Sequence, residues 1–281
     1  MSLEKYHIER NTIQETLVIP LLARKKCTQL FPTLYKDEKA EELINKLDYD
    51  FAALENNSSG FVKKFGSLEI AMRQLDMASE IKDYLKGHPH ASVINMGCGL
   101  DQTAESCDNG KCKIYNIDLP DVIEVRNELI PPESRVKNIG IDFKDTTWFS
   151  EIENFNGSVF FASGVFYYLR EDDVHNLVNK MAEYFKGGKL VVDTCNKTGL
   201  KMMLKTVVKS AGIDNVSGYF HVNTMDKDVT PWLKNARASK KGYMLGYHDL
   251  KEHCIPCSYR MLSKFGDNNI NMQILRFDFN K

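Results

Sequence analysis

The chain has 281 residues, of which 43% are hydrophobic and 27% charged, a composition typical of a folded globular protein rather than of a disordered or collagen-like one. Its 37 lysines and arginines meet 38 acidic residues, so the basic surplus of most nucleic-acid-binding proteins is missing. No apolar run approaches the roughly 18 residues that a membrane span needs, and the start MSLEKYHIERN is polar, so we expect a cytoplasmic protein without nucleic-acid or membrane partners.

The first 90 residues contain three helical patterns, at residues 16–25, 39–47 and 68–86. The third pattern is the clearest, since its apolar side chains recur every three or four positions: Ala71, Leu75, Ala78, Ile81 and Leu85. Pro20 weakens the first pattern, because proline lacks the amide hydrogen that a helix interior uses. We therefore predict an all-helical lead-in over residues 1–90.

From residue 92 to about residue 195, short apolar runs alternate with longer amphipathic segments. The runs predict buried strands at residues 92–96, 113–117, 136–141, 158–162 and 189–193. The apolar pattern of residues 170–185 predicts an amphipathic helix that begins with acidic residues and ends at a glycine pair. This alternation predicts a parallel sheet with crossover helices. Residues 272–279 predict one more strand, for which the sequence identifies no partner, and residues 200–210 a further helix.

Seven cysteines, an odd number spread along the chain, predict reduced thiols rather than a disulfide framework. One cluster has the form of a metal or redox site: His253-Cys254-Ile255-Pro256-Cys257. No second pair lies at zinc-ligand spacing, so plain buried or surface thiols are the simpler interpretation and no metal is expected.

The turn after the first strand is the first place to look for a ligand, because parallel sheets bind ligands outside the carboxyl ends of their strands. Gly97 and Gly99 in this turn let the backbone bend tightly and approach a ligand, although such glycine pairs are common. Asp118 ends the next strand and can accept both hydrogens of a ribose diol, so the pair predicts an adenosine ligand. A dinucleotide site needs a third glycine where Gln102 stands, which favours S-adenosylmethionine over a nicotinamide dinucleotide.

Two further turns at the ends of predicted strands carry groups that can contact the adenine base and the sulfonium of such a ligand. Asp142 can accept the adenine amino proton, and Phe143 can flank the base. The aromatic residues of segment 163–169 can seat a sulfonium cation, although core packing is the commoner role of any single ring. Four successive turns with fitting groups together favour a ligand site.

Residues 95–101, 117–123 and 164–169 together resemble the leucine carboxyl methyltransferase superfamily. The closer likeness is to its polyketide-synthesis O-methyltransferase branch, the tetracenomycin-synthesis type. Residues 15–24 and 48–51, and Arg73 with Asp76 on the third helix, extend the likeness into the lead-in.

The resemblance implies an α/β, Rossmann-like sheet of seven strands, the last antiparallel, with helices on both faces. It implies that residues 1–90 roof the cofactor pocket of a catalytic domain over residues 91–281. S-adenosylmethionine is the implied cofactor, with its carboxylate on Arg73 and its ribose on Asp118 beside Leu119. The other implied contacts come from Gly97, Gly99, Asp142, Phe143, Ser163 and Gly164. Two departures affect this set: Ser163 stands where the family often has glutamate, and Gln102-Thr103 follow Asp101 where Thr-Arg is common.

Methyl transfer from a sulfonium is an in-line displacement, for which the protein aligns the acceptor and excludes water. A carboxylate acceptor needs no base, whereas a phenol profits from a nearby proton acceptor. The sequence does not identify a catalytic residue; weak candidates are Tyr167, His221, His248 and His253.

Residues 193–251 resemble the family least, and their mixture of aromatic and polar side chains, including Trp232, predicts that they shape the pocket of a small-molecule acceptor. The alternatives are a protein C-terminal carboxyl methyltransferase, a nicotinamide-dependent oxidoreductase and a cofactor-binding homologue without catalysis. Neither the acceptor nor the oligomeric state follows from the sequence.

Overall fold

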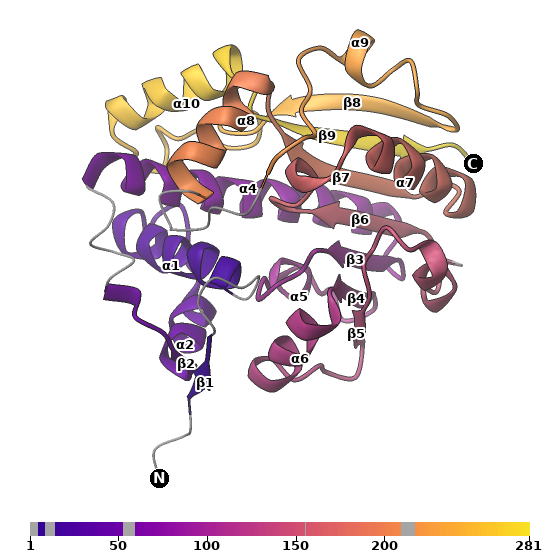
Figure 1. Cartoon of the computed structure of the whole chain (residues 1–281), viewed down its shortest axis with the longest axis horizontal. Coiled ribbons are helices and arrows are strands. Elements are labelled where there is room, and N and C mark those ends of the chain that lie inside the picture. Colours follow the sequence, from indigo (N-terminus) through magenta and orange to yellow (C-terminus); the bar gives the residue numbers. More distant parts are fainter. Residues whose placement is uncertain (1–4, 9–14, 53–59, 155, 209–216) are drawn as a thin grey trace.

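A seven-stranded sheet runs through the middle of the computed structural model, which describes residues 5–8, 15–52, 60–154, 156–208 and 217–281 (Figure 1). The strands are β3 (Ser92–Met96), β4 (Lys113–Asp118), β5 (Val136–Gly140), β6 (Ser158–Ala162), β7 (Lys189–Thr194), β8 (Ala236–Gly242) and β9 (Gln273–Phe279). All five strands expected between residues 92 and 193 are present with bounds within one residue. The expected α/β class with a mainly parallel seven-stranded sheet is therefore confirmed.

The strand order β5-β4-β3-β6-β7-β9-β8 contains a reversal of winding direction, which is where open parallel sheets generally bind their ligands. From β3 the chain winds outward through β4 to β5, and it then returns to place β6 on the other side of β3. The carboxyl ends of β3 and β6 consequently border a crevice between two connections that leave in opposite directions.

The tail strand, whose partner the sequence did not identify, is β9, which runs antiparallel between β7 and β8. β8 was not predicted from the sequence. Its residues, ARASKKG, lack apolar alternation, and most are only partly buried. β8 is an edge strand of the sheet, where charged residues are suitable because they discourage pairing with other chains.

The lead-in contains α1 (Glu15–Leu30), α2 (Glu38–Lys46) and α4 (Gly60–Gly87), at the three places where helices were expected. α1 continues through Pro20, and α4 begins eight residues earlier than its apolar pattern suggests. The expectation of an all-helical lead-in is wrong in one detail: β1 (Tyr6–His7) and β2 (Leu47–Asp48) form a short parallel pair.

The other helices follow the strands. They are α5 (Thr103–Ser106), α6 (Pro120–Leu129), α7 (Glu171–Tyr184), α8 (Lys197–Met203), α9 (Met225–Asp228) and α10 (Cys257–Asn269), with 3-10 turns η1 (Thr146–Glu151) and η2 (Phe166–Tyr168). The helix expected at residues 200–210 begins earlier as α8 and passes into a π-helical turn, η3 (Leu204–Val208); residues 209 and 210 lie outside the described residues.

Helices cover both faces of the sheet. Neighbouring strand residues point to opposite faces, so Val93 belongs to the core beneath α4, whereas Ile94 belongs to the core beneath α7. α1, α2 and α6 share a third apolar core beside these two. Among the described residues, no helix is both long enough and apolar enough to cross a membrane.

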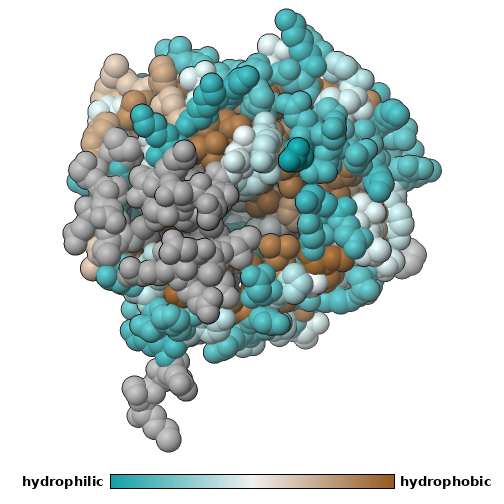
Figure 2. Space-filling model, viewed as in Figure 1, coloured by the Kyte–Doolittle hydropathy of each residue, from teal (hydrophilic) through white to brown (hydrophobic). Residues whose placement is uncertain are grey.

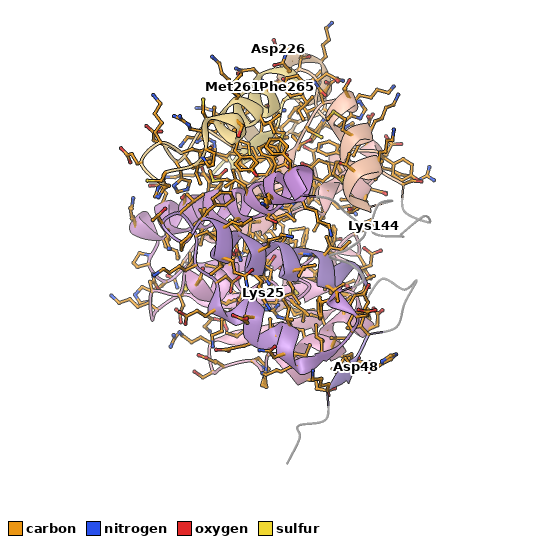
Figure 3. All side chains as sticks on the ribbon, turned by 90° about the vertical axis from the view of Figure 1, so that its left-hand side faces the viewer. Lys25, Asp48, Lys144, Asp226, Met261 and Phe265 are labelled. Carbon is orange, nitrogen blue, oxygen red and sulfur yellow. The ribbon has the colours of Figure 1, made fainter. Side chains whose placement is uncertain are left out.

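The rim of the molecule is mainly hydrophilic in the view of Figure 2, with apolar surface nearer the middle of that face. α10 is an exception, because Met261 and Phe265 are 69% and 46% exposed (Figure 3). These side chains project at the surface of α10.

Candidate functional site

The turn that follows β3 is built from two glycines with left-handed backbone conformations. Gly97 has φ +70° and Gly99 has φ +48°. A Cβ at Gly97 would lie 2.6 Å from a methyl carbon of Val165, so any side chain there would collide with the turn after β6. The amides of Gly97 and Cys98 both donate to the carbonyl of Ile117, at 2.8 and 3.2 Å. The glycine turn is thereby held against the end of β4.

Asp118 joins the turns after β3 and β4. Its Oδ2 accepts the amide of Gly99 at 2.7 Å, and its Oδ1 accepts the amide of Leu119 at 2.8 Å. Each carboxylate oxygen has a second lone pair, so both remain able to accept from a ligand diol. Burial raises the pKa of Asp118 above its usual range, against the effect of the two amides. The structure thus brings together Gly99, Asp118 and Leu119 as the sequence predicted.

Arg126 supports the same turn from below, a role that the sequence analysis did not detect. It is fully buried, and its Nη1 donates to the carbonyls of Gly99 and Asp101 at 2.8 and 2.7 Å. Its Nη2 donates to Glu105 at 2.7 Å. The sequence contains a signal for this burial. Arg126 lies one helical turn after Val122, on the side of α6 that carries its buried apolar residues, so a buried arginine could have been predicted there.

Asp101 attaches the lead-in to the glycine turn. Its carboxylate accepts Gln74 of α4 at 2.7 Å and Thr103 at 2.8 Å, and it lies 3.3 Å from Arg24 of α1. Leu17 of α1 also lies over the turn, since a Cβ at Gly99 would be 3.0 Å from it. α1 and α4 are therefore parts of the site rather than a separate unit.

The third turn carries Asp142 and Phe143, the residues expected near adenine. The amide of Ile141 donates to the carbonyl of Asp118 at 2.8 Å, so this turn is joined to the second one. The side chain of Asp142 is 47% exposed and lies 3.3 Å from Nζ of Lys144. Phe143 is mostly buried, with its ring 6.4 Å from that of Phe166 and nearly parallel to it. A solvent-facing carboxylate next to an aromatic wall fits an adenine amino group.

Arg73 reaches the fourth turn from α4. Its Nη1 lies 3.2 Å from Asp193, whose other oxygen accepts the amide of Gly164 at 2.7 Å. Arg73 is not a solvated surface group, because only 16% of its side chain is exposed. Ser163, the residue before Gly164, is partly exposed. Asp193 was missed as a site residue, although it lies near the end of a predicted buried strand, as Asp118 does.

These residues fit S-adenosylmethionine. The carboxylates of Asp118 and Asp142 lie on the β4 side of the crevice, and the guanidinium of Arg73 lies on the β6 side. Among the described residues, the Arg73 side chain makes one hydrogen bond, from Nη1 to Asp193, and 16% of it is exposed. The guanidinium therefore keeps donors that a ligand can use. Arginine suits a carboxylate because its planar fork donates parallel hydrogen bonds.

The four candidate catalytic residues do not gather at one place. Tyr167 is buried against Cys195, and burial raises its pKa well above the usual range. His221 is partly buried, 2.9 Å from the carbonyl of Tyr219. His253 contacts the carbonyl of Thr33 at 2.8 Å.

Trp232 belongs to segment 193–251, the predicted acceptor segment. It stacks on His175 of α7 with ring centres 4.3 Å apart and packs on the core beneath that helix.

His248 lies beside a buried carboxyl group, Asp76, with Nε2 3.6 Å from Oδ1. Asp76 is fully buried, and burial, with Asp267 next, raises its pKa to about 10. Burial lowers the pKa of His248, so the contact is one between neutral groups near pH 7 rather than an ion pair.

We expect Asp76 to make the protein less stable as pH rises. Its folded pKa lies above the unfolded value of about 4, so the folded state holds its proton longer and stability is lost progressively from about pH 4 upward to pH 10. Asp76→Asn removes this dependence. The free energy of unfolding of the variant minus that of wild type should grow by up to about 1.4 kcal/mol per pH unit in urea titrations at pH 6, 7 and 8. A difference that stays constant over these values would contradict the pKa assignment.

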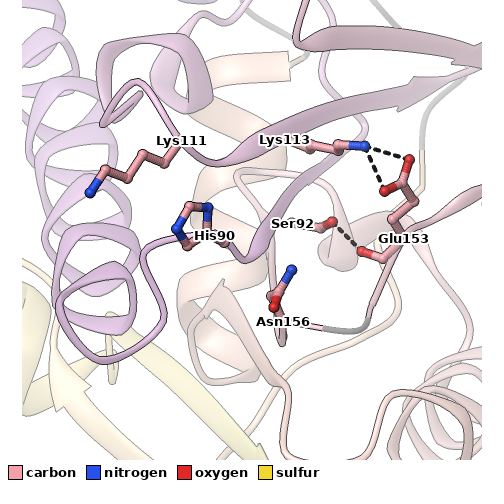
Figure 4. Close-up of a pocket in the computed structure, with 6 residues that line it drawn as sticks. All are labelled: His90, Ser92, Lys111, Lys113, Glu153 and Asn156. Atoms are coloured by element: carbon pink, nitrogen blue, oxygen red, sulfur yellow. Dashed lines mark hydrogen bonds and ion pairs between the residues drawn. The ribbon is translucent and has the colours of Figure 1, made fainter.

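A small cavity on the molecule lies away from these turns. It is lined by His90, Ser92, Lys111, Lys113, Glu153 and Asn156 (Figure 4). Ser92 and Lys113 are the first residues of β3 and β4, so this cavity opens at the amino ends of the strands. The ligand-binding crevice of a parallel sheet lies at the opposite, carboxyl ends.

Solved structures share this fold. A Thermobifida fusca crystal structure assigned as a methyltransferase has a TM-score of 0.60 at 15% identity, over 86% of this chain and 93% of that one. The plantazolicin methyltransferase BpumL, solved with a triazolic desmethylPZN analog and S-adenosylhomocysteine, has a TM-score of 0.51 at 13% identity, over 96% of this chain and 100% of that one. At such identities the likeness shows the fold alone.

Sequence relatives agree with the resemblance noted in the sequence. Tetracenomycin polyketide synthesis O-methyltransferase TcmP of Streptomyces glaucescens is 28% identical over 182 residues, 64% of this chain and 65% of TcmP. The S-adenosyl-L-methionine-dependent methyltransferase dpfgK of Gibberella zeae is 24% identical over 200 residues, 66% of this chain and 65% of that protein. The chain thus matches somewhat less than two thirds of either relative. A family model described as leucine carboxyl methyltransferase matches residues 18–182, more than half of the chain, which therefore belongs to that family.

Proposed function

We propose that the chain is an S-adenosylmethionine-dependent O-methyltransferase that methylates a hydroxyl or carboxylate of a small, polyketide-like molecule. One observation carries the proposal. At the crevice between β3 and β6, Asp118 lies on one side and Arg73, whose guanidinium makes one hydrogen bond among the described residues, lies on the other. A ligand with a ribose at one end and a carboxylate at the other satisfies both groups. The relatives named above support this cofactor and this class of acceptor.

Each end of the cofactor has its own residues in this proposal. Asp118 accepts the two ribose hydroxyls, and Leu119 lies beside them. Asp142 accepts the adenine amino proton, and Phe143 forms the apolar wall. Contacts to the methionyl end come from Arg73, Gly97, Ser163 and Gly164, with Gly99 shaping the turn between the two ends.

The cofactor supplies an activated methyl group, and the chain's contribution is to align the acceptor oxygen and keep water out. A carboxylate acceptor is already ionised at neutral pH. For a hydroxyl acceptor, the suitable proton acceptor of the chain is His221, which lines the proposed acceptor groove.

The acceptor site in this proposal is a groove of about 470 Å³ built from the connections after β6 and β7. It is lined by Arg170, Glu171, Asp172, Lys197, Leu200, Lys201, Leu204, Gly218, Tyr219 and His221. Leu200 in its wall is buried against Tyr167 and Cys195, close to the carboxyl ends of both strands. The amide of Tyr219 donates to the carbonyl of Tyr167 at 2.8 Å, which fixes the opposite wall. All lining residues from 197 onward belong to segment 193–251, the predicted acceptor segment.

Leu204→Trp tests the acceptor site, because the larger ring narrows the groove without touching the cofactor residues. With a panel of hydroxy- and carboxy-substituted polycyclic aromatics, we expect wild type to release S-adenosylhomocysteine from S-adenosylmethionine, and the variant to lose at least about 90% of kcat/KM, about 1.4 kcal/mol. Its calorimetric affinity for S-adenosylhomocysteine should be unchanged.

Met261→Trp on α10 is the matched control, since it adds the same ring at an exposed position, and it should keep wild-type turnover. If Leu204→Trp methylates every accepted compound as wild type does, this groove is not the acceptor site.

A further inference from the structure

Asp193, near the end of β7, holds two groups on the methionyl side of the site. Its Oδ1 accepts the amide of Gly164 at 2.7 Å, and its Oδ2 lies 3.2 Å from Nη1 of Arg73. Only 1% of its side chain is exposed, so the carboxylate faces protein groups rather than the open crevice. Asp193 therefore joins three elements: the strand β7, the turn after β6 and the helix α4.

The contact leaves Arg73 only partly satisfied. Asp193 accepts from one nitrogen of the guanidinium, Nη1, and this is the one hydrogen bond that the Arg73 side chain makes among the residues that the structure describes. A guanidinium carries five donors in a fixed fork, so a single-point contact leaves donors for a second acceptor. A carboxylate is the acceptor whose two oxygens match such a fork.

Gly164 allows the guanidinium to lie directly on the backbone. Its φ is +74°, and a Cβ at this position would be 2.6 Å from Nη1 and 2.9 Å from Cζ of Arg73. Any side chain at residue 164 would displace the guanidinium from Asp193. The place of Arg73 is thus determined from two sides, by the glycine beneath it and by the carboxylate beside it.

The guanidinium stays charged in this buried place. Burial lowers the pKa of Arg73, but Asp193, Tyr243 and Tyr167 raise it, and the resulting pKa lies above the ordinary value. Glu69 lies on the same helix and is also close to Arg73. A charged donor that is already held in place loses little freedom when a ligand binds, so the affinity of the site depends on the group that holds it.

We propose that Asp193 is a positioning residue for cofactor binding, which holds the Arg73 guanidinium and the Gly164 amide so that the remaining donors of Arg73 meet the methionyl carboxylate. The inference rests on the proposed function, because it takes S-adenosylmethionine as the ligand. Asp193 acts through Arg73 and does not touch the ligand. A merely structural ion pair between α4 and β7 would influence both ends of the cofactor equally or neither.

Asp193→Asn separates these roles. The amide oxygen still accepts from Gly164, whereas the amide nitrogen now faces Arg73 with a donor and releases it. We expect calorimetry to show affinity for S-adenosylhomocysteine reduced about 10- to 100-fold. Affinity for 5′-methylthioadenosine, which has the same nucleoside but no amino-acid group, should change less than about threefold. Arg73→Lys should lower S-adenosylhomocysteine binding similarly, and the double variant should lose no more than the stronger single one.

Glu80→Gln is the matched control, because Glu80 of α4 pairs with Lys189 of β7 at 2.6 Å and so joins the same two elements elsewhere. It should leave the ratio of the two affinities unchanged. If Asp193→Asn does not fold, Asp193→Glu keeps the charge but displaces it, and the same selective loss is expected.

Unchanged or tighter S-adenosylhomocysteine binding by folded Asp193→Asn, or an equal loss for both ligands, would overturn the inference. If wild type binds neither ligand, the proposed function fails instead.

Discussion

Replacing Arg126 with methionine is expected to lower the free energy of unfolding by about 3–5 kcal/mol, the usual cost of breaking a buried charged contact by removing one partner. The guanidinium is fully buried and donates to two backbone carbonyls and one carboxylate. Methionine has a similar length but no donors, so the carbonyls of Gly99 and Asp101 lose these bonds and Glu105 loses its cation. Urea titration followed by circular dichroism measures the loss.

The same substitution should also weaken S-adenosylhomocysteine binding, since Arg126 fixes the carbonyl side of the glycine turn. Arg135→Met is the control: Arg135 pairs with Asp108 at the surface, and an exposed pair of this kind contributes little to stability. The control should unfold almost as wild type does. Should Arg126→Met unfold at the same urea concentration as Arg135→Met, the glycine turn does not depend on the buried arginine.

The sheet could be predicted from the sequence because its central strands are short apolar runs bounded by turns. Ser92–Met96 and Ser158–Ala162 are buried at every position, and their predicted and observed bounds coincide. β8 could not be predicted, because its residues form a strand only through pairing with β9, a segment more than 30 residues later in the chain. Local pattern carries no information about such a partner.

The glycine turn and Asp118 were predictable for a similar reason, since residue type and strand end suffice to place them. The residues that hold the turn were not. Asp101 is bound by Arg24 and Gln74, which are distant in sequence, and Arg73 meets Asp193 across 120 residues. Only the folded sheet brings these groups together. Residue type alone is also insufficient for the catalytic candidates. His221, His248 and His253 look equivalent in the sequence, but the fold places them in three different surroundings.

Asp118→Ala should remove the hydrogen bonds that hold the ribose. Hydrogen bonds to a charged group are worth about 1.5–3 kcal/mol, so affinity for S-adenosylhomocysteine should fall about 10- to 150-fold. Because 5′-methylthioadenosine has the same ribose, its affinity should fall by a similar factor, unlike in Asp193→Asn. The two substitutions therefore report on opposite ends of the ligand.

Asp121→Ala is the matched control, since this exposed carboxylate lies three residues away in the first turn of α6. It should bind both ligands as wild type does. Loss of the amide contacts to Gly99 and Leu119 also affects the turn itself, so the folded state of Asp118→Ala is checked by circular dichroism before titration.

Calorimetric titration of S-adenosylhomocysteine into wild type, Asp118→Ala and Asp121→Ala tests the central claim most directly, which is that an adenosine-containing methyl donor lies across the turns after β3 and β4. The account predicts binding to wild type and to Asp121→Ala, a 10- to 150-fold weaker affinity for folded Asp118→Ala, about 1.5–3 kcal/mol, and no binding of NADH to any of the three. Wild-type affinity in folded Asp118→Ala, or binding of NADH in preference to S-adenosylhomocysteine, would contradict it.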